Sequence, residues 1–371
     1  MGLSVQINDD ADGMRLALEW AAKGMYITSP NPRVGCVLVR DGAVLGAGHT
    51  QPAGQAHAEI EALRDAQARG NDVRGATAFV TLEPCNHHGR TPPCSEALVA
   101  ARLSRVVAAM VDPNPQVAGQ GLATLAAAGI DVSAGLMAQQ AYELNIGFFS
   151  RMQHGRPWVR MKTAASLDGM TALHNGQSQW ITGPEARADG HAWRARACAI
   201  LTGIGTVKTD DPQLTVRALD TPRQPRRIIV DSRLEITLGA KVLQGAPSWI
   251  VGAIPDPAKQ VALEAAGHTV IMLPNAAGKV DLTALMRELG RRDINELHVE
   301  AGAKLNGSLI RAGCVDELLV YLAPALLGDA QGMFALAPLE QLDGQVRLRF
   351  HEVSPIGEDL RILARFNHSK G

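Results

Sequence analysis

One stretch of the chain, residues 81–94, reads Thr81-Leu82-Glu83-Pro84-Cys85-Asn86-His87-His88-Gly89-Arg90-Thr91-Pro92-Pro93-Cys94. It holds two cysteines, and it is preceded in the chain by His57-Ala58-Glu59. One neutral imidazole and two thiolates suit Zn²⁺ and leave its fourth position for water. We therefore predict that His57, Cys85 and Cys94 bind zinc.

Glu59 is the predicted proton carrier of this site. Zinc lowers the pKa of a bound water enough to form hydroxide near neutral pH, and a nearby carboxylate that is not a ligand can move its proton. Glu59 stands two positions after His57, at the start of a helix predicted over residues 56–69. Histidine, glutamate and two cysteines in this order are typical of zinc nucleobase deaminases, although eight residues rather than two separate Cys85 from Cys94.

Two other interpretations of these residues remain open. Free cysteine is often a buried small apolar residue, so the cysteines could belong to a core without metal. His87 and His88 are rival ligands, and either one could close the fourth position of a purely structural zinc site. We assign them instead to contacts around the zinc or with the substrate, because a catalytic zinc needs an open position.

The first 150 residues alternate predicted helices and strands, an order that places helices on both faces of a sheet. Helices are predicted at residues 12–25, 56–69, 95–102, 121–128 and 138–148. Strands are predicted at residues 34–39, 43–47, 76–82, 106–111 and 130–133. The polar stretch 151–157, with Gly and Pro, marks the boundary, so we expect domains at residues 1–150 and 151–371.

The second half repeats the alternation without any internal repeat. Strands are predicted at residues 158–164, 200–202, 227–231, 248–251, 269–273, 296–300 and 317–322. Helices are predicted at residues 184–195, 257–266, 282–291 and 304–312. Polar clusters follow several strands, and ligands of open α/β sheets gather at the carboxyl ends of strands. The turn over residues 300–308 could receive a pyrophosphate at a helix N-terminus, although such turns are also common helix caps.

Residues 81–94 as a whole resemble the signature of the bifunctional riboflavin-biosynthesis deaminase/reductase family. Two upstream segments, Asn31-Pro32-Arg33-Val34-Gly35 and Gly46-Ala47-Gly48-His49-Thr50, are similar to the pyrimidine-site segments of that family. The long cysteine spacing separates this family from cytidine and tRNA-adenosine deaminases. The resemblance implies an α/β protein whose N-terminal domain is a cytidine-deaminase-like three-layer α/β/α domain.

The second half resembles the reductase half of the same family, so the resemblance covers nearly the whole chain. It implies a C-terminal α/β domain similar to dihydrofolate reductase. The Rossmann fingerprint G-x-G-x-x-G after the first strand is absent, so the sequence does not indicate a standard dinucleotide fold.

The resemblance also implies a hydrolase and an oxidoreductase in one multifunctional enzyme. The first activity removes the amino group at C2 of 2,5-diamino-6-ribosylamino-4(3H)-pyrimidinone 5′-phosphate by hydrolysis. The second uses NADPH to reduce the ribosyl group of 5-amino-6-(5-phosphoribosylamino)uracil to ribityl, by hydride transfer to C1′.

The site residues implied by the resemblance are carried over position by position. In the first half, Asn31 and His49 hold the base or the ribose phosphate, unless they are only a turn residue and a surface histidine. The implied cofactor contacts are Ala164, Trp180, Thr206, Asp210 and the turn Gly302-Ala303-Lys304-Leu305-Asn306-Gly307-Ser308. The implied substrate contacts of the second half are Ser178, Arg194, Leu214, Arg217 and Glu300.

Arginine suits a phosphate through its fork geometry, so Arg194 and Arg217 can pair with the 5′-phosphate. Each could also be only a solvated surface residue. The sequence does not identify the residue that reads the 2′-phosphate of NADPH, nor the proton donor of the reduction.

The bulk composition limits the partners. The 371 residues carry a net charge of −1, so the basic footprint of a nucleic-acid-editing deaminase is missing. No apolar run reaches transmembrane length, and the N-terminus does not resemble a secretory signal. Five cysteines in such a chain argue against a disulfide framework, and Cys36, Cys198 and Cys314 are predicted core residues. We expect a cytoplasmic enzyme of a small pyrimidine ribosyl phosphate, without membrane or nucleic-acid partners. The resemblance implies a homodimer formed through the reductase domain.

Overall fold

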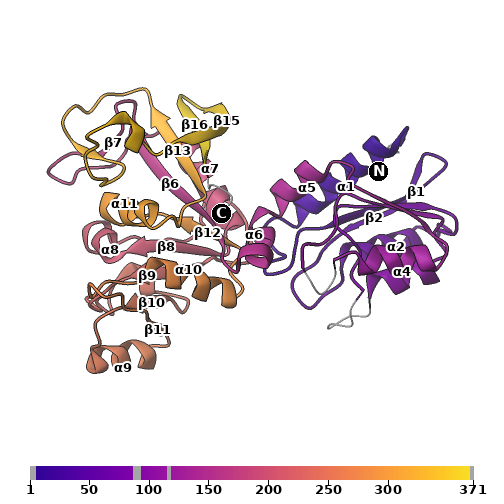
Figure 1. The fold of residues 1–371 in the computed structure, drawn as a ribbon, viewed down its shortest axis with the longest axis horizontal. Coiled ribbons are helices and arrows are strands. Elements are labelled where there is room, and N and C mark those ends of the chain that lie inside the picture. Colours follow the sequence, from indigo (N-terminus) through magenta and orange to yellow (C-terminus); the bar gives the residue numbers. More distant parts are fainter. Residues whose placement is uncertain (1–5, 87–92, 115–117, 368–371) are drawn as a thin grey trace. The chain divides into compact units, whose positions relative to one another are not determined.

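The computed structural model describes residues 6–86, 93–114 and 118–367 (Figure 1). The chain forms two compact units, unit 1 over Met1–His154 and unit 2 over Gly155–Gly371. The boundary expected after residue 150 falls inside helix α6 (Ile146–His154). The helix continues to His154, and Gly155 then leaves the helical conformation with a φ of 66°.

Unit 1 contains a five-stranded sheet in the order β2-β1-β3-β4-β5. β1 (Gly35–Arg40) and β2 (Ala43–His49) form an antiparallel hairpin, whose turn residues Asp41 and Gly42 both have positive φ. β3 (Thr77–Val80), β4 (Arg105–Ala108) and β5 (Asp131–Ala134) continue the sheet in parallel.

Helices cover both faces of this sheet, which confirms the three-layer α/β/α architecture expected for the first half. α1 (Asp10–Lys23) and α5 (Ala138–Leu144) share one apolar core with the strands. α2 (Ala58–Ala68), α3 (Cys94–Ala100) and α4 (Gln120–Ala127) share the core on the other face. The strands alternate between the cores: Val37 belongs to the first, whereas Cys36 and Leu38 belong to the second.

The helix predicted over residues 138–148 is in fact two helices, because the chain turns at Asn145. The side chain of Asn145 accepts a hydrogen bond from the Arg33 amide and donates one to the Arg33 carbonyl. Bonding of this kind to a distant backbone competes with a continuous helix.

Glycines allow the helices of unit 1 to approach the hairpin closely. A Cβ at Gly35 would lie 2.0 Å from the carbonyl oxygen of Ala17 in α1. A Cβ at Gly48 would lie 2.5 Å from Cβ of Glu61 in α2. α2 therefore begins directly over the end of β2, and His57 immediately precedes it.

Unit 2 contains a nine-stranded sheet in the order β11-β10-β9-β8-β12-β6-β13-β16-β15. The strands from β11 to β13 run parallel, β16 runs antiparallel to them, and β15 runs antiparallel to β16 at the edge of the sheet. Their bounds are β6 (Trp158–Ser166), β8 (Ala199–Gly203), β9 (Arg226–Val230), β10 (Trp249–Gly252), β11 (Thr269–Met272), β12 (Glu296–Val299), β13 (Glu317–Ala323), β15 (Leu348–Ile356) and β16 (Asp359–Phe366). β7 (Met170–Ala172) and β14 (Gln331–Gly332) form a separate small ribbon.

Helices also pack on both faces of the large sheet. α10 (Leu282–Arg291) and α11 (Ala303–Arg311) share the core of one face, and α8 (Ile204–Asp210) and α9 (Pro257–Ala265) share that of the other. α7 (Pro184–Arg196) packs on β13 and β16. The expected α/β class therefore holds for both units.

The sequence patterns missed several elements of unit 2, namely α8, the β7–β14 ribbon and the β15–β16 hairpin. No strand was predicted after residue 322. β15 is exposed along most of its length, and a bulge between Phe350 and Glu352 interrupts the alternation of its apolar residues, so the pattern is too short to indicate a strand.

Candidate active sites

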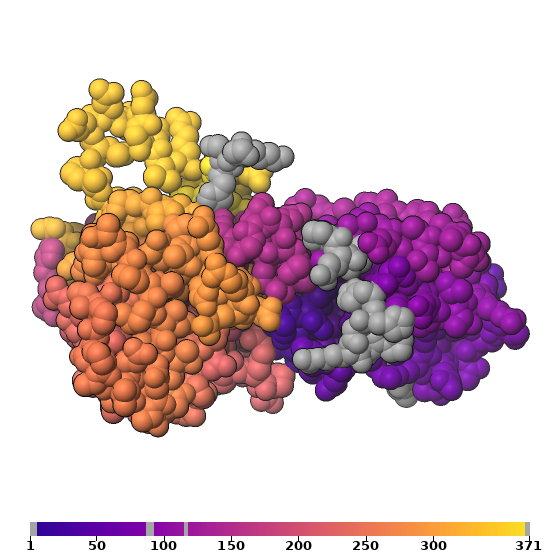
Figure 2. Space-filling view, turned by 60° about the horizontal axis from the view of Figure 1, so that its bottom comes forward, coloured from indigo at the N-terminus to yellow at the C-terminus, as the bar shows by residue number. Residues whose placement is uncertain are grey.

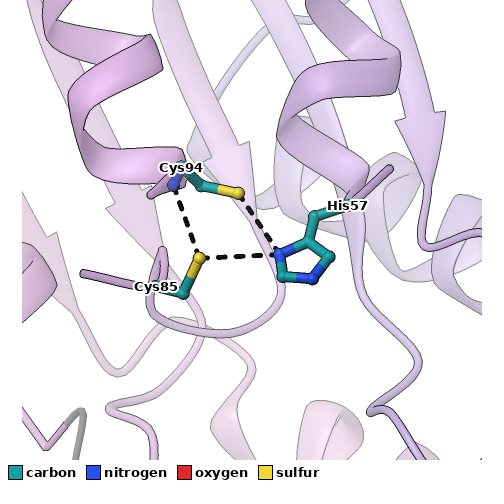
Figure 3. Close-up of side chains that lie close together, drawn as sticks. All are labelled: His57, Cys85 and Cys94. Atoms are coloured by element: carbon teal, nitrogen blue, oxygen red, sulfur yellow. Dashed lines mark hydrogen bonds between the residues drawn. The ribbon is translucent and has the colours of Figure 1, made fainter. Parts of the chain in front are cut away.

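Three separate segments of unit 1 bring the predicted zinc ligands together (Figure 3). His57 precedes α2, Cys85 follows β3, and Cys94 is the first residue of α3. Their ligand atoms all lie within 4.8 Å of one another. The Nδ1 atom of His57 is 3.5 Å from Sγ of Cys85 and 3.4 Å from Sγ of Cys94.

These distances fit zinc. Tetrahedral ligands with Zn–S of about 2.3 Å and Zn–N of about 2.0 Å lie about 3.5 Å apart. The hydrogen bond between the two thiols lowers the pKa of Cys85 to about 4 and raises that of Cys94. Two sulfurs this close can both be thiolates only with a cation between them, and a divalent metal provides one.

Glu83 holds the loop that carries Cys85, a role that the sequence interpretation missed. Its buried carboxylate accepts hydrogen bonds from four backbone amides, those of Asp112, Gly119, Gly121 and Leu122. A Cβ at Gly121 would lie 1.9 Å from the carbonyl oxygen of Pro84, so α4 packs directly on this loop. The signal available in the sequence was a carboxylate within the motif, two positions before Cys85.

Glu59 lies in the first turn of α2, and only 3% of its surface is exposed. Burial, followed by the charge of Cys85, raises the pKa of its carboxyl to about 7. The carboxyl is also within hydrogen-bonding reach of Cys94. A carboxyl with this pKa can both take up and release a proton near neutral pH.

Asn31 and His49 come to the same end of the sheet as the zinc ligands. His49 ends β2 and is paired with Gly35, whose amide donates to Oγ1 of Thr81 at the start of the motif. The loop that contains Asn31 is fastened by Arg33, which donates to the carbonyl oxygen of Leu144. His87 and His88 lie outside the described residues.

Unit 2 places Arg194 and Glu300 side by side where β12 ends. Two nitrogens of the Arg194 guanidinium bond both oxygens of Glu300, and a third donates to the carbonyl oxygen of Thr215. Burial alone would favour the neutral acid, but the Arg194 guanidinium holds the pKa of Glu300 well below its ordinary value. Glu300 is therefore a carboxylate at neutral pH.

Two further residues of this region were not predicted as site residues. Lys162 of β6 interacts electrostatically with Glu300 and Arg194, and burial of its ammonium group lowers its pKa. His191 accepts a hydrogen bond at Nδ1 from the amide of Arg217. The sequence did offer an indication of each residue: Lys162 is a lysine within an apolar strand, and His191 lies one helical turn before Arg194. Lys162, Arg194 and Arg217 give this region an excess of positive charge over Glu300, which suits a phosphate.

The predicted cofactor turn begins at Gly302, which caps α11. The Gly302 amide donates to Oγ1 of Thr206 over 3.1 Å, so α8 and α11 begin next to each other. Gly205 has open space where a side chain would stand, which is where a backbone can approach a pyrophosphate. The residues at the start of this helix therefore fit the anionic centre of a dinucleotide.

Not every residue of the turn faces outward. A Cβ at Gly307 would lie 2.2 Å from the carbonyl oxygen of Ala335, and Asn306 donates to the carbonyl oxygen of Met333. Both residues are buried, and their contacts fasten α11 to the 333–335 segment. Leu305 packs toward Gly203, and Ser308 donates to the carbonyl oxygen of Lys304.

The remaining predicted contacts are spread over the strand ends and loops of unit 2. Ala164 is half-buried in β6, and Ser178 lies half-buried in the loop before α7. Trp180 is 69% exposed, with the Arg187 guanidinium 4.6 Å from its ring centre. Asp210 ends α8, and Leu214 is buried with a φ of 51°.

Known proteins share both halves of this arrangement. Residues 7–110 match the family model of the cytidine and deoxycytidylate deaminase zinc-binding region, and residues 157–362 match that of the RibD C-terminal domain. The riboflavin biosynthesis protein RibD of Escherichia coli K12 is 48% identical over 363 residues, which cover 94% of this chain and 96% of that protein. The RibD protein of Haemophilus influenzae is 45% identical over 376 residues, covering 96% and 97%.

Solved structures agree with these relatives. Acinetobacter baumannii RibD superimposes with a TM-score of 0.88 and 41% identity, covering 97% of this chain and 99% of that one. The diaminohydroxyphosphoribosylaminopyrimidine deaminase/5-amino-6-(5-phosphoribosylamino)uracil reductase of Thermotoga maritima superimposes with a TM-score of 0.85 and 30% identity, covering 96% and 98%.

Within the described residues, no helix is both long enough and apolar enough to cross a membrane. The zinc-ligand triangle, the order of the two units and the full-length relatives lead to one assignment. The chain belongs to the RibD family, the bifunctional deaminases and reductases of riboflavin biosynthesis.

Proposed function

We propose that residues 1–150 hydrolyse the C2 amino group of 2,5-diamino-6-ribosylamino-4(3H)-pyrimidinone 5′-phosphate, and that residues 151–371 reduce the product with NADPH. The observation that carries the proposal is the triangle of His57, Cys85 and Cys94 with the buried carboxyl of Glu59 beside it. Names of relatives that include both a pyrimidine deaminase and a uracil reductase support the substrates.

In the deaminase, His57, Cys85 and Cys94 would hold zinc, which activates water for attack at C2. Glu59 takes a proton from the attacking water and delivers it to the amino nitrogen, which leaves as ammonia. Its raised pKa suits both transfers. Asn31 and His49, at the same end of the sheet, hold the base and the ribose phosphate.

In the reductase, bound NADPH would supply the hydride for the reduction at C1′, where the C1′–O4′ bond breaks and O4′ gains a proton. Arg217 is better placed than Arg194 to bind the 5′-phosphate. Its guanidinium contacts the neutral acceptors Gln213 and Thr215, whereas that of Arg194 is already paired with Glu300. The Arg194–Glu300 pair is left to orient the ribose.

The remaining contacts follow from where the residues lie. Ser178 and Leu214 would complete the substrate site. Ala164, Trp180, Thr206, Asp210 and the turn from Gly302 to Ser308 would surround NADPH, with Asn306 and Gly307 acting through the position of α11.

An apolar surface on unit 2 supports a homodimer formed through the reductase. The stretch 336–353 exposes seven large apolar side chains, and Figure 2 shows the C-terminal part of unit 2, in yellow, standing out from its body. They are Leu336, Leu339, Leu342, Val346, Leu348, Phe350 and Val353. Monomeric proteins rarely expose such a patch, and a two-fold contact would bury it in both copies. The free state of all five cysteines supports a reducing, cytoplasmic location.

Replacing a ligand should remove the metal. We expect the Cys85→Ser variant to carry less than about a tenth of the zinc bound by the wild type, because the site loses a thiolate. Cys314→Ala, at a buried cysteine of unit 2, is the matched control and should retain the metal. Elemental analysis of the purified proteins measures the difference. Equal zinc contents in the Cys85→Ser and Cys314→Ala variants would contradict the assignment of Cys85 as a zinc ligand.

Glu59→Gln should retain zinc but lower ammonia release by about 10²- to 10⁴-fold, the usual contribution of a general acid–base group. The variant should still oxidise NADPH when it is given the deaminated substrate. The assay follows ammonia first without nicotinamide and then follows NADPH absorbance. Loss of both activities in a folded variant would contradict two separate sites.

Arg217→Ala should raise the KM of the reductase for its ribosyl phosphate by about 10- to 100-fold, because hydrogen bonds to charged groups are worth about 1.5–3 kcal/mol. The kcat should change little, since the phosphate is remote from C1′. Arg226→Ala is the control, because this half-buried arginine stands at the amino end of β9 and donates to the carbonyl oxygen of Pro247. A decrease in kcat with an unchanged KM would contradict the proposed role of Arg217 in binding the 5′-phosphate.

Phe350→Glu should convert the dimer into monomers, because it places a charge in the apolar patch. Sedimentation velocity of the full chain measures the change. Val261→Glu is the control, since Val261 is similarly exposed at 66% but lies on α9. A dimer that survives Phe350→Glu unchanged would exclude this surface.

A further inference from the structure

One side of α7 is bonded to the segment 213–217, which carries Arg217. His191 and Arg194 stand three positions apart on α7, so their side chains leave the same side of the helix. Nδ1 of His191 accepts a hydrogen bond from the amide of Arg217 over 3.2 Å. The guanidinium of Arg194 donates to the carbonyl oxygen of Thr215, also over 3.2 Å. These two hydrogen bonds fix the helix and the segment against each other.

A further contact holds the segment in place. The side chain of Gln224 accepts a hydrogen bond from the amide of Val216 over 2.7 Å and donates to the carbonyl oxygen of Val216 over 3.1 Å. Leu214 and Val216 are buried, whereas Arg217 is exposed. The backbone next to the His191 ring is therefore positioned before any ligand binds, which reduces the entropy lost on binding.

The hydrogen bond from the Arg217 amide decides which nitrogen of His191 carries a proton. A ring nitrogen that accepts from an amide has no proton of its own, so Nδ1 is unprotonated. Burial of the ring, followed by the charges of Arg194 and Arg217, lowers the pKa of His191, so the ring is neutral at neutral pH. The single proton of the neutral imidazole is then on Nε2.

The Nε2–H group of His191 has no acceptor among the residues that the structure describes. The ring is only half-buried, so a ligand can reach this donor. It stands beside Arg217, whose guanidinium contacts the neutral acceptors Gln213 and Thr215. A phosphate monoester has three strong acceptor oxygens, and a guanidinium fork pairs with two of them. One oxygen is thus left for a second donor.

We propose that His191 is a substrate-binding residue of the reductase, and that its Nε2–H donates to the 5′-phosphate beside Arg217. The hydrogen bond at Nδ1 orients the ring for this contact. Because the ring is neutral, it contributes a directed hydrogen bond and leaves the charge of the phosphate to the arginine. The proposal rests on the reductase function proposed above and names a further residue of that same site.

The test compares two variants of His191 in the full-length zinc-loaded protein. In His191→Asn, the side-chain oxygen can still accept from the Arg217 amide, but no group replaces the Nε2–H. We expect its KM for the ribosyl phosphate to rise by about 10- to 100-fold, because a hydrogen bond to a charged group is lost. The kcat and the dissociation constant of NADPH should stay within about twofold of the wild type, since the phosphate is remote from C1′.

His191→Gln exchanges the two functions of the ring. Its side-chain nitrogen can reach the position of Nε2, whereas the acceptor for the Arg217 amide is lost. The KM should stay within about threefold of the wild type, because the phosphate keeps its donor. With the riboside that lacks the 5′-phosphate, neither substitution should change kcat/KM, because this compound offers the donor no phosphate.

His268→Asn is the matched control. Nδ1 of His268 also accepts a hydrogen bond from a backbone amide, that of Ser248 over 3.3 Å, and this ring is also half-buried. His268 directly precedes β11, so it lies at the amino ends of the strands, whereas the proposed site is at their carboxyl ends. The substitution should change none of these constants.

A KM that rises in His191→Gln but not in His191→Asn would mean that His191 only positions Arg217, and it would overturn the proposal. Equal effects of the two substitutions would also overturn it, as would an equal loss of kcat/KM on the riboside in His191→Asn. A wild type that does not oxidise NADPH with the ribosyl phosphate would reject the reductase function itself, an outcome separate from the failure of His191 alone.

Discussion

The deaminase site depends on one buried carboxylate, that of Glu83, which gathers four backbone amides from the segment that leads into α4. Those amides belong to a helix N-terminus and its preceding loop, where donors have no partner within the helix. By satisfying them, Glu83 joins the loop after β3 to α4, and Cys85 follows Glu83 by two residues. Without this carboxylate, the amides would be buried without acceptors, and the position of Cys85 would no longer be determined.

Buried charged side chains also organise unit 2, through ion pairs between its strands. At the amino ends of its central strands, the buried Arg160 pairs with Glu296 and Glu317, and these carboxylates pair in turn with Arg196 and Arg365. These pairs join β6, β12, β13 and β16 at one end of the sheet. At the carboxyl ends, positive charge is in excess around Glu300, so phosphate-bearing ligands have one end of the sheet to bind.

Much of the fold could be predicted because the buried strands and amphipathic helices repeat apolar residues at regular spacing. The prediction failed where burial does not determine the pattern. In β15 a bulge after Phe350 interrupts the alternation of apolar residues. The helix after residue 138 breaks because Asn145 bonds Arg33, more than a hundred positions away. The sequence also did not predict Lys162 as a site residue, or that Asn306 and Gly307 are buried. Each of these depends on a neighbour distant in the sequence.

The sequence by itself determined the chemistry that depends on residue type and order: one histidine and two cysteines for zinc, a glutamate two positions from the histidine, and a motif specific enough to indicate the family. The tertiary structure decided which atom of His57 faces the thiols, how deeply Glu59 is buried, and that Arg194 rather than Arg217 pairs with Glu300. It also decided that the Lys208 ammonium pairs with the carboxylate of Glu235. Ligand identity is a property of single side chains, whereas pKa, charge balance and orientation arise from groups that only folding brings within a few ångströms of one another.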